Sequence, residues 1–305
     1  MANEYLQYKP LVESFGCEVR TDEPMKNHTS FKIGGCADLF VTVNDEKQLS
    51  SVIRLCNGNN IPLFVLGNGS NLLVSDKGIR GVVLRLSGEF CDIGFNSDGS
   101  VHCGAGAQLS RLCAFALEHS LTGLEFAWGI PGSCGGAAFM DAGAYGGEMR
   151  DVIISCEHVV LSTGETGRFE GDELDFAYRH SVYSAGGYVI TALNLVLEKG
   201  DKEAIKAKMD DLMSRRKDKQ PLEYPSAGSV FKRPVGYFAG GLIEQCGLKG
   251  TQVGGAMVSP KHAGFIVNVG GATCEDVLGL IVSIQKTVRE ETGVELECEV
   301  RKTGE

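Results

Sequence analysis

The sequence contains no apolar run approaching the ~18 residues of a membrane span. Its first residues, MANEYLQYKPLVESF, lack the basic head and apolar stretch of an export signal, so we expect a cytoplasmic protein and no membrane partner. The 11 cysteines include no C-x-x-C pair, and the 6 histidines include no H-x-x-x-H pair. These absences argue against a zinc module, a disulfide framework and a helical metal site, and we expect no bound metal.

Basic residues are in deficit, with 29 Lys and Arg against 39 Asp and Glu and a formal net charge of −10 at pH 7. Nucleic-acid binding favours clustered Lys and Arg, so no nucleic-acid partner is expected. An anionic ligand would need local basic residues to hold it against the overall negative field. The sequence also lacks the P-loop pattern G-x-x-x-x-G-K-[ST] and the dinucleotide fingerprint G-x-G-x-x-G.

A chain of 305 residues with 43% hydrophobic and 22% charged residues is typical of a folded protein of about two domains. Predicted strands and helices mix without a strict β-α-β-α order, which favours the α+β class. The composition changes at the charged stretch 199–221, so we place a domain boundary near Gly200. The expected domains are 1–200, with subdomains of about 1–87 and 88–200, and 201–305.

Apolar periodicity predicts the main elements. Leu49, Val52, Ile53 and Cys56 recur at helical spacing, with Asp45 as the N-cap and an end at Gly58. Further helices are expected at 109–117, 199–221 and 238–247 and from Thr273 onward. Strands are expected at 37–43, 61–66, 81–86, 152–161, 188–198, 264–269 and 294–300.

Two glycine-rich stretches stand out, GNGSN at 67–71 and GIPGSCGG at 129–136, and DAGAYGG follows at 141–147. Glycine loses more conformational entropy on folding than other residues, so a close approach to the main chain is expected there. Backbone N–H groups in such loops bind phosphate, and Ser70, Asn71 and Ser133 add side-chain donors. Tight turns at sheet ends explain the same glycines equally well. Two such loops favour a long ligand with two phosphates.

Six ordered blocks carry a family resemblance from about His28 to the C-terminus: LGNGSNLLVSDKGIRGVVLRL, EFAWGIPGSCGGAAFMDAGAYGGE, YRHSVY, PSAGSVFKRP, KHAGFIVN and ELECEVR. Together they resemble the UDP-N-acetylenolpyruvoylglucosamine reductases. The resemblance implies a flavin-binding domain of the vanillyl-alcohol-oxidase/p-cresol-methylhydroxylase type and a separate C-terminal substrate domain. Between Tyr178 and Tyr188 there is no room for the tyrosine-bearing insertion of the family's long form, so the chain resembles the short form.

The reaction implied by the resemblance has two halves. NADPH gives a hydride to non-covalently bound FAD, and the reduced flavin gives one to the enolpyruvyl C3 of UDP-N-acetylglucosamine enolpyruvate. The product, UDP-N-acetylmuramate, serves peptidoglycan synthesis. Such a reaction needs a fixed cation, a hydrogen-bond donor and a proton donor.

The cofactor residues are implied by the resemblance, which has both glycine loops hold the FAD diphosphate and 141–147 lie along the flavin. They are Leu66, Gly67, Asn68, Gly69, Ser70, Asn71, Ile130, Pro131, Gly132, Ser133, Gly135, Gly136, Ala142, Gly143, Gly146 and Arg233. Cys134 stands where the family usually has a small aliphatic residue, and Asp141 where it commonly has Asn. A carboxylate near a phosphate or flavin is costly unless it hydrogen-bonds away from the anion.

The resemblance assigns catalysis to Arg179, Ser229 and Glu299. The planar fork of Arg179 matches a carboxylate, although an ion pair with nearby Asp175 is the simpler structural explanation. Ser229 maps onto the family's proton donor, but to the motif alone Ser226 is an equal candidate. In VELECEVR three glutamates alternate with apolar residues, and only the resemblance selects Glu299, whose pKa should rise beside a substrate carboxylate.

The substrate's diphosphate needs residues that bind it. The substrate-binding residues that the resemblance suggests are Tyr145, Arg216, Gln220 and Arg301. A solvated helix end explains Arg216 almost equally well. Lys232 and Arg233 are within reach of a diphosphate from either ligand. His28 and His262 are expected to be structural.

Two other functions remain open at this stage. A flavin oxidase of the same fold would tether its flavin covalently, and His102 or Cys134 would be the attachment point. A non-catalytic nucleotide-binding module would take up no FAD.

Overall fold

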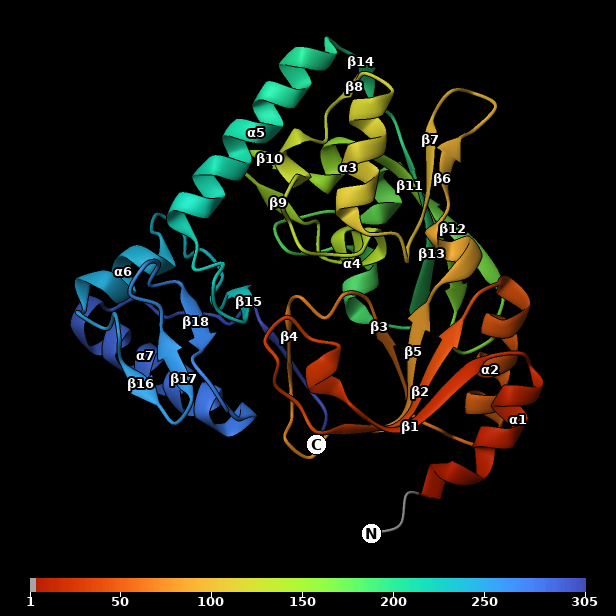
Figure 1. The fold of residues 1–305 in the computed structure, drawn as a ribbon, viewed down its shortest axis with the longest axis horizontal. Coiled ribbons are helices and arrows are strands. Elements are labelled where there is room, and N and C mark those ends of the chain that lie inside the picture. The colour runs from red at the N-terminus through yellow and green to blue at the C-terminus, as the bar shows by residue number, and fades with distance from the viewer. Residues whose placement is uncertain (1–3) are drawn as a thin grey trace. The chain divides into compact units, whose positions relative to one another are not determined.

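The structure is a computed structural model that describes residues 4–305, and Figure 1 shows its elements. Two units emerge: one holds the chain up to Thr21 with Leu39–Asn68 and Gly81–Arg215, the other Asp22–Asp38, Gly69–Arg80 and Arg216–Glu305. The units part after Arg215 rather than near Gly200, because Ile205 and Met209 are buried in the core of the first unit. The roles expected for the two parts, FAD binding and substrate binding, stay predictions.

Two sheets build the first unit. The strand order in the four-stranded sheet is β1 (Glu18–Pro24), β2 (Cys36–Val43), β5 (Ile79–Leu86) and β3 (Leu63–Leu66). The order in the five-stranded sheet is β12 (Thr166–Glu170), β11 (Ile153–Val160), β13 (Tyr188–Leu195), β7 (Val101–Gly104) and β6 (Ile93–Phe95). Every neighbouring pair in the five-stranded sheet is antiparallel, whereas β3 and β5 run parallel, which agrees with the expected mixed class.

The helices of the first unit follow their apolar spacing. Helix α2 (Glu46–Gly58) begins where predicted, because the Asp45 side chain accepts a hydrogen bond from the Gln48 N–H. Helix α3 (Leu109–Glu118) buries Leu109 and Leu112. Helix α4 (Cys134–Phe139) was not predicted, since two of its six residues are glycine. Helix α4 packs against β7 and β13, and α3 packs against α4 (Figure 1).

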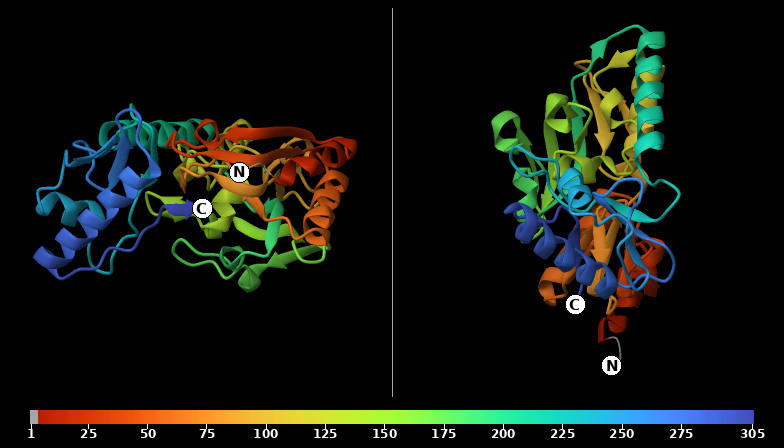
Figure 2. Two further views of the ribbon diagram at one scale, coloured as in Figure 1. Left: turned by 90° about the horizontal axis from the view of Figure 1, so that it is seen from below. Right: turned by 90° about the vertical axis from the view of Figure 1, so that its left-hand side faces the viewer.

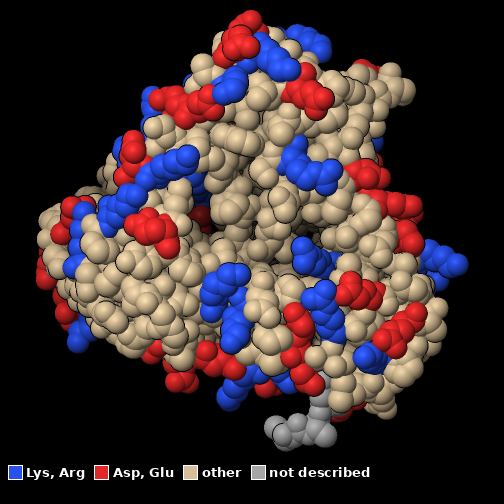
Figure 3. Space-filling view, in the orientation of Figure 1, with Lys and Arg blue, Asp and Glu red and all other residues tan. Residues whose placement is uncertain are grey.

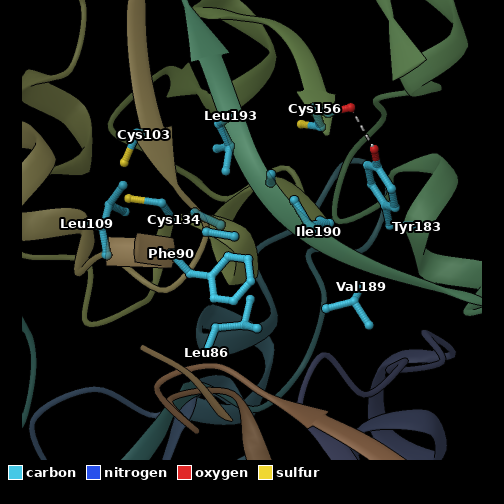
Figure 4. Close-up of a cluster of buried hydrophobic side chains, with 14 of the residues drawn as sticks. Leu86, Phe90, Cys103, Leu109, Cys134, Cys156, Tyr183, Val189, Ile190 and Leu193 are labelled. Carbon is cyan, nitrogen blue, oxygen red and sulfur yellow. Dashed lines mark hydrogen bonds between the residues drawn. The ribbon is translucent and has the colours of Figure 1, made fainter. Parts of the chain in front are cut away.

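The core of the first unit combines side chains from these helices and sheets (Figure 4). Phe90 and Leu86 lie on one side of it, and Cys103 and Cys134 point their sulfur atoms toward each other. The Tyr183 hydroxyl donates to the Cys156 carbonyl at 3.3 Å. The cysteines of this core therefore act as small apolar residues.

Helix α5 (Lys202–Lys219) is the charged helix expected at 199–221. It buries Ile205, Met209 and Leu212 along one side. Its outer surface mixes Lys and Arg with Asp and Glu (Figure 3). This pattern is typical of a solvated helix face. Within residues 4–305, no helix combines the length and apolar character that a membrane crossing requires.

The second unit has a four-stranded antiparallel sheet in the order β15 (Ser226–Ser229), β18 (Phe265–Asn268), β17 (Ala256–Val258) and β16 (Gln252–Val253). Helix α7 (Cys274–Thr292) lies against one face of this sheet (Figure 2). Thr273 caps α7 because its side chain accepts a hydrogen bond from the Asp276 N–H, and the helix begins where the sequence predicts. Helix α6 (Ala239–Gln245) packs against α7.

The strand expected at 294–300 is not formed. That stretch has a single bridge, between Phe231 and Cys298, and the strand begins later, as β19 (Arg301–Thr303) in parallel with β4 (Leu72–Val74). Backbone groups of the stretch 294–300 instead form hydrogen bonds with residues outside regular strands. For example, the Glu297 carbonyl accepts the Lys232 N–H at 2.8 Å. Alternation of apolar residues therefore identified a half-buried segment but not its pairing.

The remaining elements are short. They comprise α1 (Lys9–Ser14), the pair β8 (Leu121–Thr122) and β14 (Glu198–Lys199), the hairpin β9 (Gly143–Ala144) and β10 (Gly147–Glu148), and single 3₁₀ turns at Glu4–Tyr8, Met25–Asn27, Gly88–Cys91, Glu125–Ala127, Met149–Asp151, Gly171–Leu174 and Val182–Ala185.

Candidate active site

The start of the first glycine-rich loop, Gly67 and Asn68, meets the second loop within the first unit. Strand β3 ends at Leu66, and a Cβ added to the next residue, Gly67, would lie 2.5 Å from Ser133 Oγ. The Ser133 hydroxyl is held in place because it accepts a hydrogen bond from the Gly136 N–H at 3.2 Å. Only glycine at position 67 allows this approach.

Several backbone donors of these loops have no acceptor within residues 4–305. Within the first unit, the N–H groups of Gly67, Asn68 and Ser133 make no hydrogen bond to any residue in the described range 4–305. The N–H groups of Cys134 and Gly135 differ, since each is bonded at 2.8 Å to a carbonyl of the first unit. Unpaired main-chain N–H groups in a glycine-rich loop form an anion site. Gly67, Asn68 and Ser133 therefore supply donors within the first unit. Gly135 allows close packing, because a Cβ at that position would lie 2.8 Å from the Ala105 Cβ.

Cys134 is buried rather than presented to a ligand. Its hydrogen bond with Cys103 and its burial raise the pKa of the Cys134 thiol well above the ordinary range. A thiol in that state is a poor nucleophile, which disfavours Cys134 as a covalent flavin tether. His102, the other candidate tether, is half-buried with its Nδ1 3.3 Å from Asn194 Oδ1.

The segment 141–147 forms the hairpin β9–β10. Its two turn residues, Tyr145 and Gly146, both have positive φ, 55° and 89°. A hairpin turn of this type normally takes Asn and Gly, so a tyrosine there is strained. Tyr145 is nevertheless 44% exposed, which presents its ring at the hairpin tip. Strain of this kind is typical of a functional position.

Asp141 opens this segment, with a φ of 42° and no exposed surface. Its Oδ1 accepts the Arg150 N–H at 2.9 Å, so part of the carboxyl is satisfied within the protein. Its Oδ2 has no hydrogen bond within residues 4–305 and lies 3.6 Å from Arg150 Nε. Burial, only partly opposed by the Arg150 N–H, raises the pKa of Asp141.

Arg179 lies in a tight turn of the first unit. Ala177 and His180 exchange both backbone hydrogen bonds across it, at 3.1 and 2.9 Å, and Arg179 has a φ of 58°. Its guanidinium donates to the carbonyls of Asp141 at 3.5 Å and Gly143 at 3.4 Å. A non-glycine residue with positive φ in a turn is uncommon and strained. The structure thus brings Arg179 beside the segment expected along the flavin.

The Tyr178 ring supports the same guanidinium at 4.9 Å from its centroid. Asp175 was the alternative ion-pair partner considered for Arg179. In the structure its Oδ2 lies 3.1 Å from His180 Nε2.

Ser229 and Glu299 lie on neighbouring segments of the second unit. Ser229 ends β15, where Gly228 with a φ of 78° marks an irregularity in the pairing with β18. The following carbonyl, of Val230, accepts the Glu299 N–H at 2.7 Å. Bulges of this kind re-aim the side chain beside them.

The three glutamates of the last block differ in their surroundings. Glu295 pairs with Arg289 at 3.3 Å, and Glu297 pairs with Lys232; both glutamates are exposed. Glu299 is half-buried, and its carbonyl accepts from the Asn71 side chain at 3.1 Å.

The remaining substrate candidates also belong to the second unit. Arg216 is only 7% exposed and donates to Gln220 at 3.2 Å, so it is not a solvated helix end. Arg301 is exposed at the start of β19. The guanidinium of Arg233 lies 3.9 Å from the centroid of the Phe238 ring.

The predicted site residues therefore divide between the two units. The first unit holds Leu66, Gly67, Asn68, Ile130, Pro131, Gly132, Ser133, Gly135, Gly136, Ala142, Gly143, Tyr145, Gly146 and Arg179. The second holds Gly69, Ser70, Asn71, Arg216, Gln220, Ser229, Arg233, Glu299 and Arg301.

Two hollows in the second unit contain none of these residues. One, of about 700 Å³, is lined by Lys26, Lys32, Tyr224 and residues 268–272 among others. The other, of about 650 Å³, follows α7 near Gln285. Within the described residues no group of His, Cys, Asp and Glu is arranged to hold a metal ion.

Comparison with known families matches both parts of the chain. Residues 37–170 match the FAD binding domain family. Residues 220–303 match the family described as UDP-N-acetylenolpyruvoylglucosamine reductase, C-terminal domain. The expected combination of a flavin-binding domain and a distinct C-terminal domain is confirmed.

Named relatives extend the match over nearly the whole chain. UDP-N-acetylenolpyruvoylglucosamine reductase of Clostridium novyi is 52% identical over 94% of this chain and 93% of its own length. The Listeria monocytogenes protein of the same name is 49% identical over 94% of this chain and 95% of its own. The crystal structure of the Thermus caldophilus enzyme aligns with a TM-score of 0.80 at 38% identity, covering 94% of this chain and 99% of that one. The chain therefore belongs to the UDP-N-acetylenolpyruvoylglucosamine reductase family of FAD-dependent oxidoreductases.

Proposed function

We propose that this protein uses NADPH to reduce UDP-N-acetylglucosamine enolpyruvate to UDP-N-acetylmuramate, a step of peptidoglycan precursor synthesis in the cytoplasm. The observation that carries the proposal is the hydrogen bond from the Glu299 N–H to the Val230 carbonyl, 2.7 Å long, which keeps Glu299 beside the strand end of Ser229. A proton donor and a carboxylate on neighbouring segments suit a site that must protonate a carbon.

FAD fits the donors of the glycine loops. Gly67, Asn68 and Ser133 would hold its diphosphate through unpaired N–H groups, and Gly67 leaves the space that any Cβ would fill. When bound, FAD supplies the hydride that NADPH has given it. The buried Cys134 thiol supports a non-covalent cofactor.

Addition of hydride at C3 of the enolpyruvyl group leaves negative charge at C2 and on the neighbouring carboxylate. A cation near that carboxylate lowers the barrier because it binds the transition state more strongly than the substrate. We assign this role to Arg179, whose planar fork fits a carboxylate and whose strained turn indicates a functional position.

Ser229 donates the proton to C2. A serine hydroxyl is a weak acid, so it acts only on a strongly basic partner, which the enolate at C2 is. Glu299 orients the Ser229 hydroxyl or a water molecule and shares its proton. Its half-buried position, in contrast to the exposed Glu295 and Glu297, favours this role.

The diphosphate of the substrate needs cations, because the protein carries a net charge of −10. We assign this role to Arg216, together with its partner Gln220, and to the exposed Arg301. Arg233 is placed to contact the diphosphate of either FAD or the substrate. Tyr145 at the hairpin tip contacts the sugar nucleotide.

One anaerobic experiment tests the proposal. NADPH is added to the FAD-loaded protein, and the flavin absorbance is expected to bleach. UDP-N-acetylglucosamine enolpyruvate is then added, and the absorbance is expected to return in one turnover. Bleaching without recovery would contradict the proposal.

Two outcomes would favour the alternatives. Flavin retained in an acid-precipitated pellet would indicate a covalent oxidase. A colourless protein that takes up no FAD would indicate a non-catalytic module.

A further inference from the structure

Two serine hydroxyls of the first unit converge on one carbonyl. Ser181 has no exposed surface, and its hydroxyl donates to the Phe139 carbonyl at 2.6 Å. The Ser184 hydroxyl donates to the same oxygen at 3.1 Å and accepts the Ser181 N–H at 3.0 Å. This pair was not predicted from the sequence, because the block YRHSVY draws attention first to its arginine.

The shared carbonyl belongs to the last residue of α4. The final carbonyls of a helix lack partners within the helix, so a side chain that donates to one fixes the helix end. The first residue of the same helix follows Ser133, in the loop proposed to hold the FAD diphosphate. Helix α4 is thus capped by Ser133 at its start and bonded to Ser181 at its end.

Ser181 also lies two residues after Arg179. The Arg179 turn is closed by the reciprocal bonds of Ala177 and His180, and the next residue is Ser181. The turn is therefore anchored to α4 through a short hydrogen bond donated by a fully buried serine.

The guanidinium of Arg179 makes longer hydrogen bonds than those that close and anchor its turn. Its hydrogen bonds to the Asp141 and Gly143 carbonyls are 3.5 and 3.4 Å long, at the weak end of the range. Exchanging such bonds for a charge-assisted bond to a carboxylate is favourable. The turn beneath would stay in place during that exchange, since its anchor is a separate bond.

We propose that Ser181 is a positioning residue that fixes the Arg179 turn to helix α4, so that the guanidinium changes partner to the substrate carboxylate without moving its backbone. This inference rests on the proposed function. It assigns Ser181 no contact with substrate or cofactor; its effect reaches the reaction through Arg179. Preorganisation of this kind lowers the entropy lost on reaching the transition state.

The test compares Ser181→Ala with two other variants. Ser155→Ala is the matched control, because Ser155 is equally buried in the same unit and its hydroxyl is bonded by the Asn194 side chain at 3.1 Å. Ser181→Thr keeps the hydroxyl on an extended backbone, φ −150° and ψ 169°, which suits a β-branched residue. Both half-reactions of the FAD-loaded variants are measured by anaerobic stopped flow.

For Ser181→Ala we expect reoxidation by the enolpyruvyl substrate to slow about tenfold, the usual effect of losing one well-placed hydrogen bond. Reduction by NADPH should stay within about twofold of wild type, because Arg179 has no role in it. Ser181→Thr should restore most of the rate. Ser155→Ala should leave the ratio of the two half-reactions unchanged, even if it lowers the melting temperature.

Amide hydrogen exchange gives a readout independent of activity. Ser181→Ala should speed exchange at His180 and Ser184, and Ser155→Ala should not. Equal slowing of both half-reactions, or unchanged exchange at His180, would overturn the role of Ser181. Absence of substrate-driven reoxidation in the wild-type protein would overturn the proposed function instead, so the two failures are distinguishable.

Discussion

Gly67 lies directly against Ser133, so that a single methyl group at position 67 would come within 2.5 Å of the serine hydroxyl oxygen. The two residues belong to different glycine-rich loops, and their contact places unpaired N–H donors of both loops in one part of the first unit. The glycines at this point are therefore required by close approach, and the closeness creates the anion site.

Gly67→Ala should weaken FAD binding about tenfold or more, because the new Cβ displaces Ser133 and the donors around it. The affinity is measured by titrating apoprotein with FAD and following flavin fluorescence. In a Ser133→Ala background the nearest remaining atom is the residue-133 Cβ at 3.7 Å, an ordinary contact. The effect of Gly67→Ala should therefore shrink in that background.

Gly94→Ala is the control for this experiment, since a Cβ at Gly94 would meet no atom of the described residues within 4 Å beyond its chain neighbours. Equal losses of FAD affinity from Gly67→Ala in both backgrounds would contradict the steric account.

Arg179→Gly should separate stability from catalysis. The glycine relieves the positive φ, so the free energy of unfolding should stay the same or rise by about 1 kcal/mol. Reoxidation by the enolpyruvyl substrate should fall on the order of 100-fold, because the cation facing the carboxylate is lost. Urea unfolding and single-turnover kinetics measure the two effects.

Asp175→Gly is the matched control for Arg179→Gly. Asp175 also has a positive φ, 46°, on the same segment. It should show the stability effect without the kinetic one. Reoxidation of Arg179→Gly at the wild-type rate would show that Arg179 has no role in the mechanism.

Replacing each glutamate of the last block by Gln tests the choice of Glu299. Glu299→Gln should slow the enolpyruvyl half-reaction while NADPH reduction stays near wild type. Glu295→Gln and Glu297→Gln should leave both half-reactions nearly unchanged, since these side chains are exposed and paired with Arg289 and Lys232. Three equal effects would mean that the assignment to Glu299 is wrong.

Asp141 predicts a pH dependence of stability. Burial raises its pKa above the ordinary 3.8, so between 3.8 and the native value the folded protein binds more protons than the unfolded chain. Its contribution to stability therefore falls as the pH rises through that window and is constant above it. The free-energy difference between Asp141→Asn and wild type should grow in favour of the variant across the same window.

Urea unfolding of both proteins at a series of pH values measures this difference. The exposed Asp218→Asn variant controls for the loss of one negative charge. A difference independent of pH would show that Asp141 does not titrate abnormally in the folded protein.

The sequence predicted elements whose signals are local. The spacing of Leu49, Val52 and Ile53 and the cap at Asp45 located α2 correctly, because burial and capping act within one turn. Helix α4 was missed because its propensity is poor and its stability comes from Ser133 and from packing in the core. The strand predicted at 294–300 was wrong. Alternation of apolar and polar residues indicates which side chains are buried, whereas strand pairing depends on segments far away in the sequence.

The candidate site was only partly accessible to sequence reasoning. The glycine content suggested an anion-binding site. Only the structure distinguishes the unpaired N–H groups of Gly67 and Asn68 from those of Cys134 and Gly135, which are hydrogen-bonded within the protein. The choice of Arg179, Ser229 and Glu299 depended on family resemblance. The anchor at Ser181 depends on a contact between segments far apart in sequence, which periodicity cannot reveal.

The most direct test of the central claim is the pair of half-reaction rates for Ser229→Ala, measured anaerobically with NADPH and then with UDP-N-acetylglucosamine enolpyruvate. If Ser229 hands its proton to the substrate carbon, flavin reduction will proceed almost as in wild type while reoxidation collapses. Equal damage to both rates, or reoxidation at the wild-type rate, would contradict that assignment.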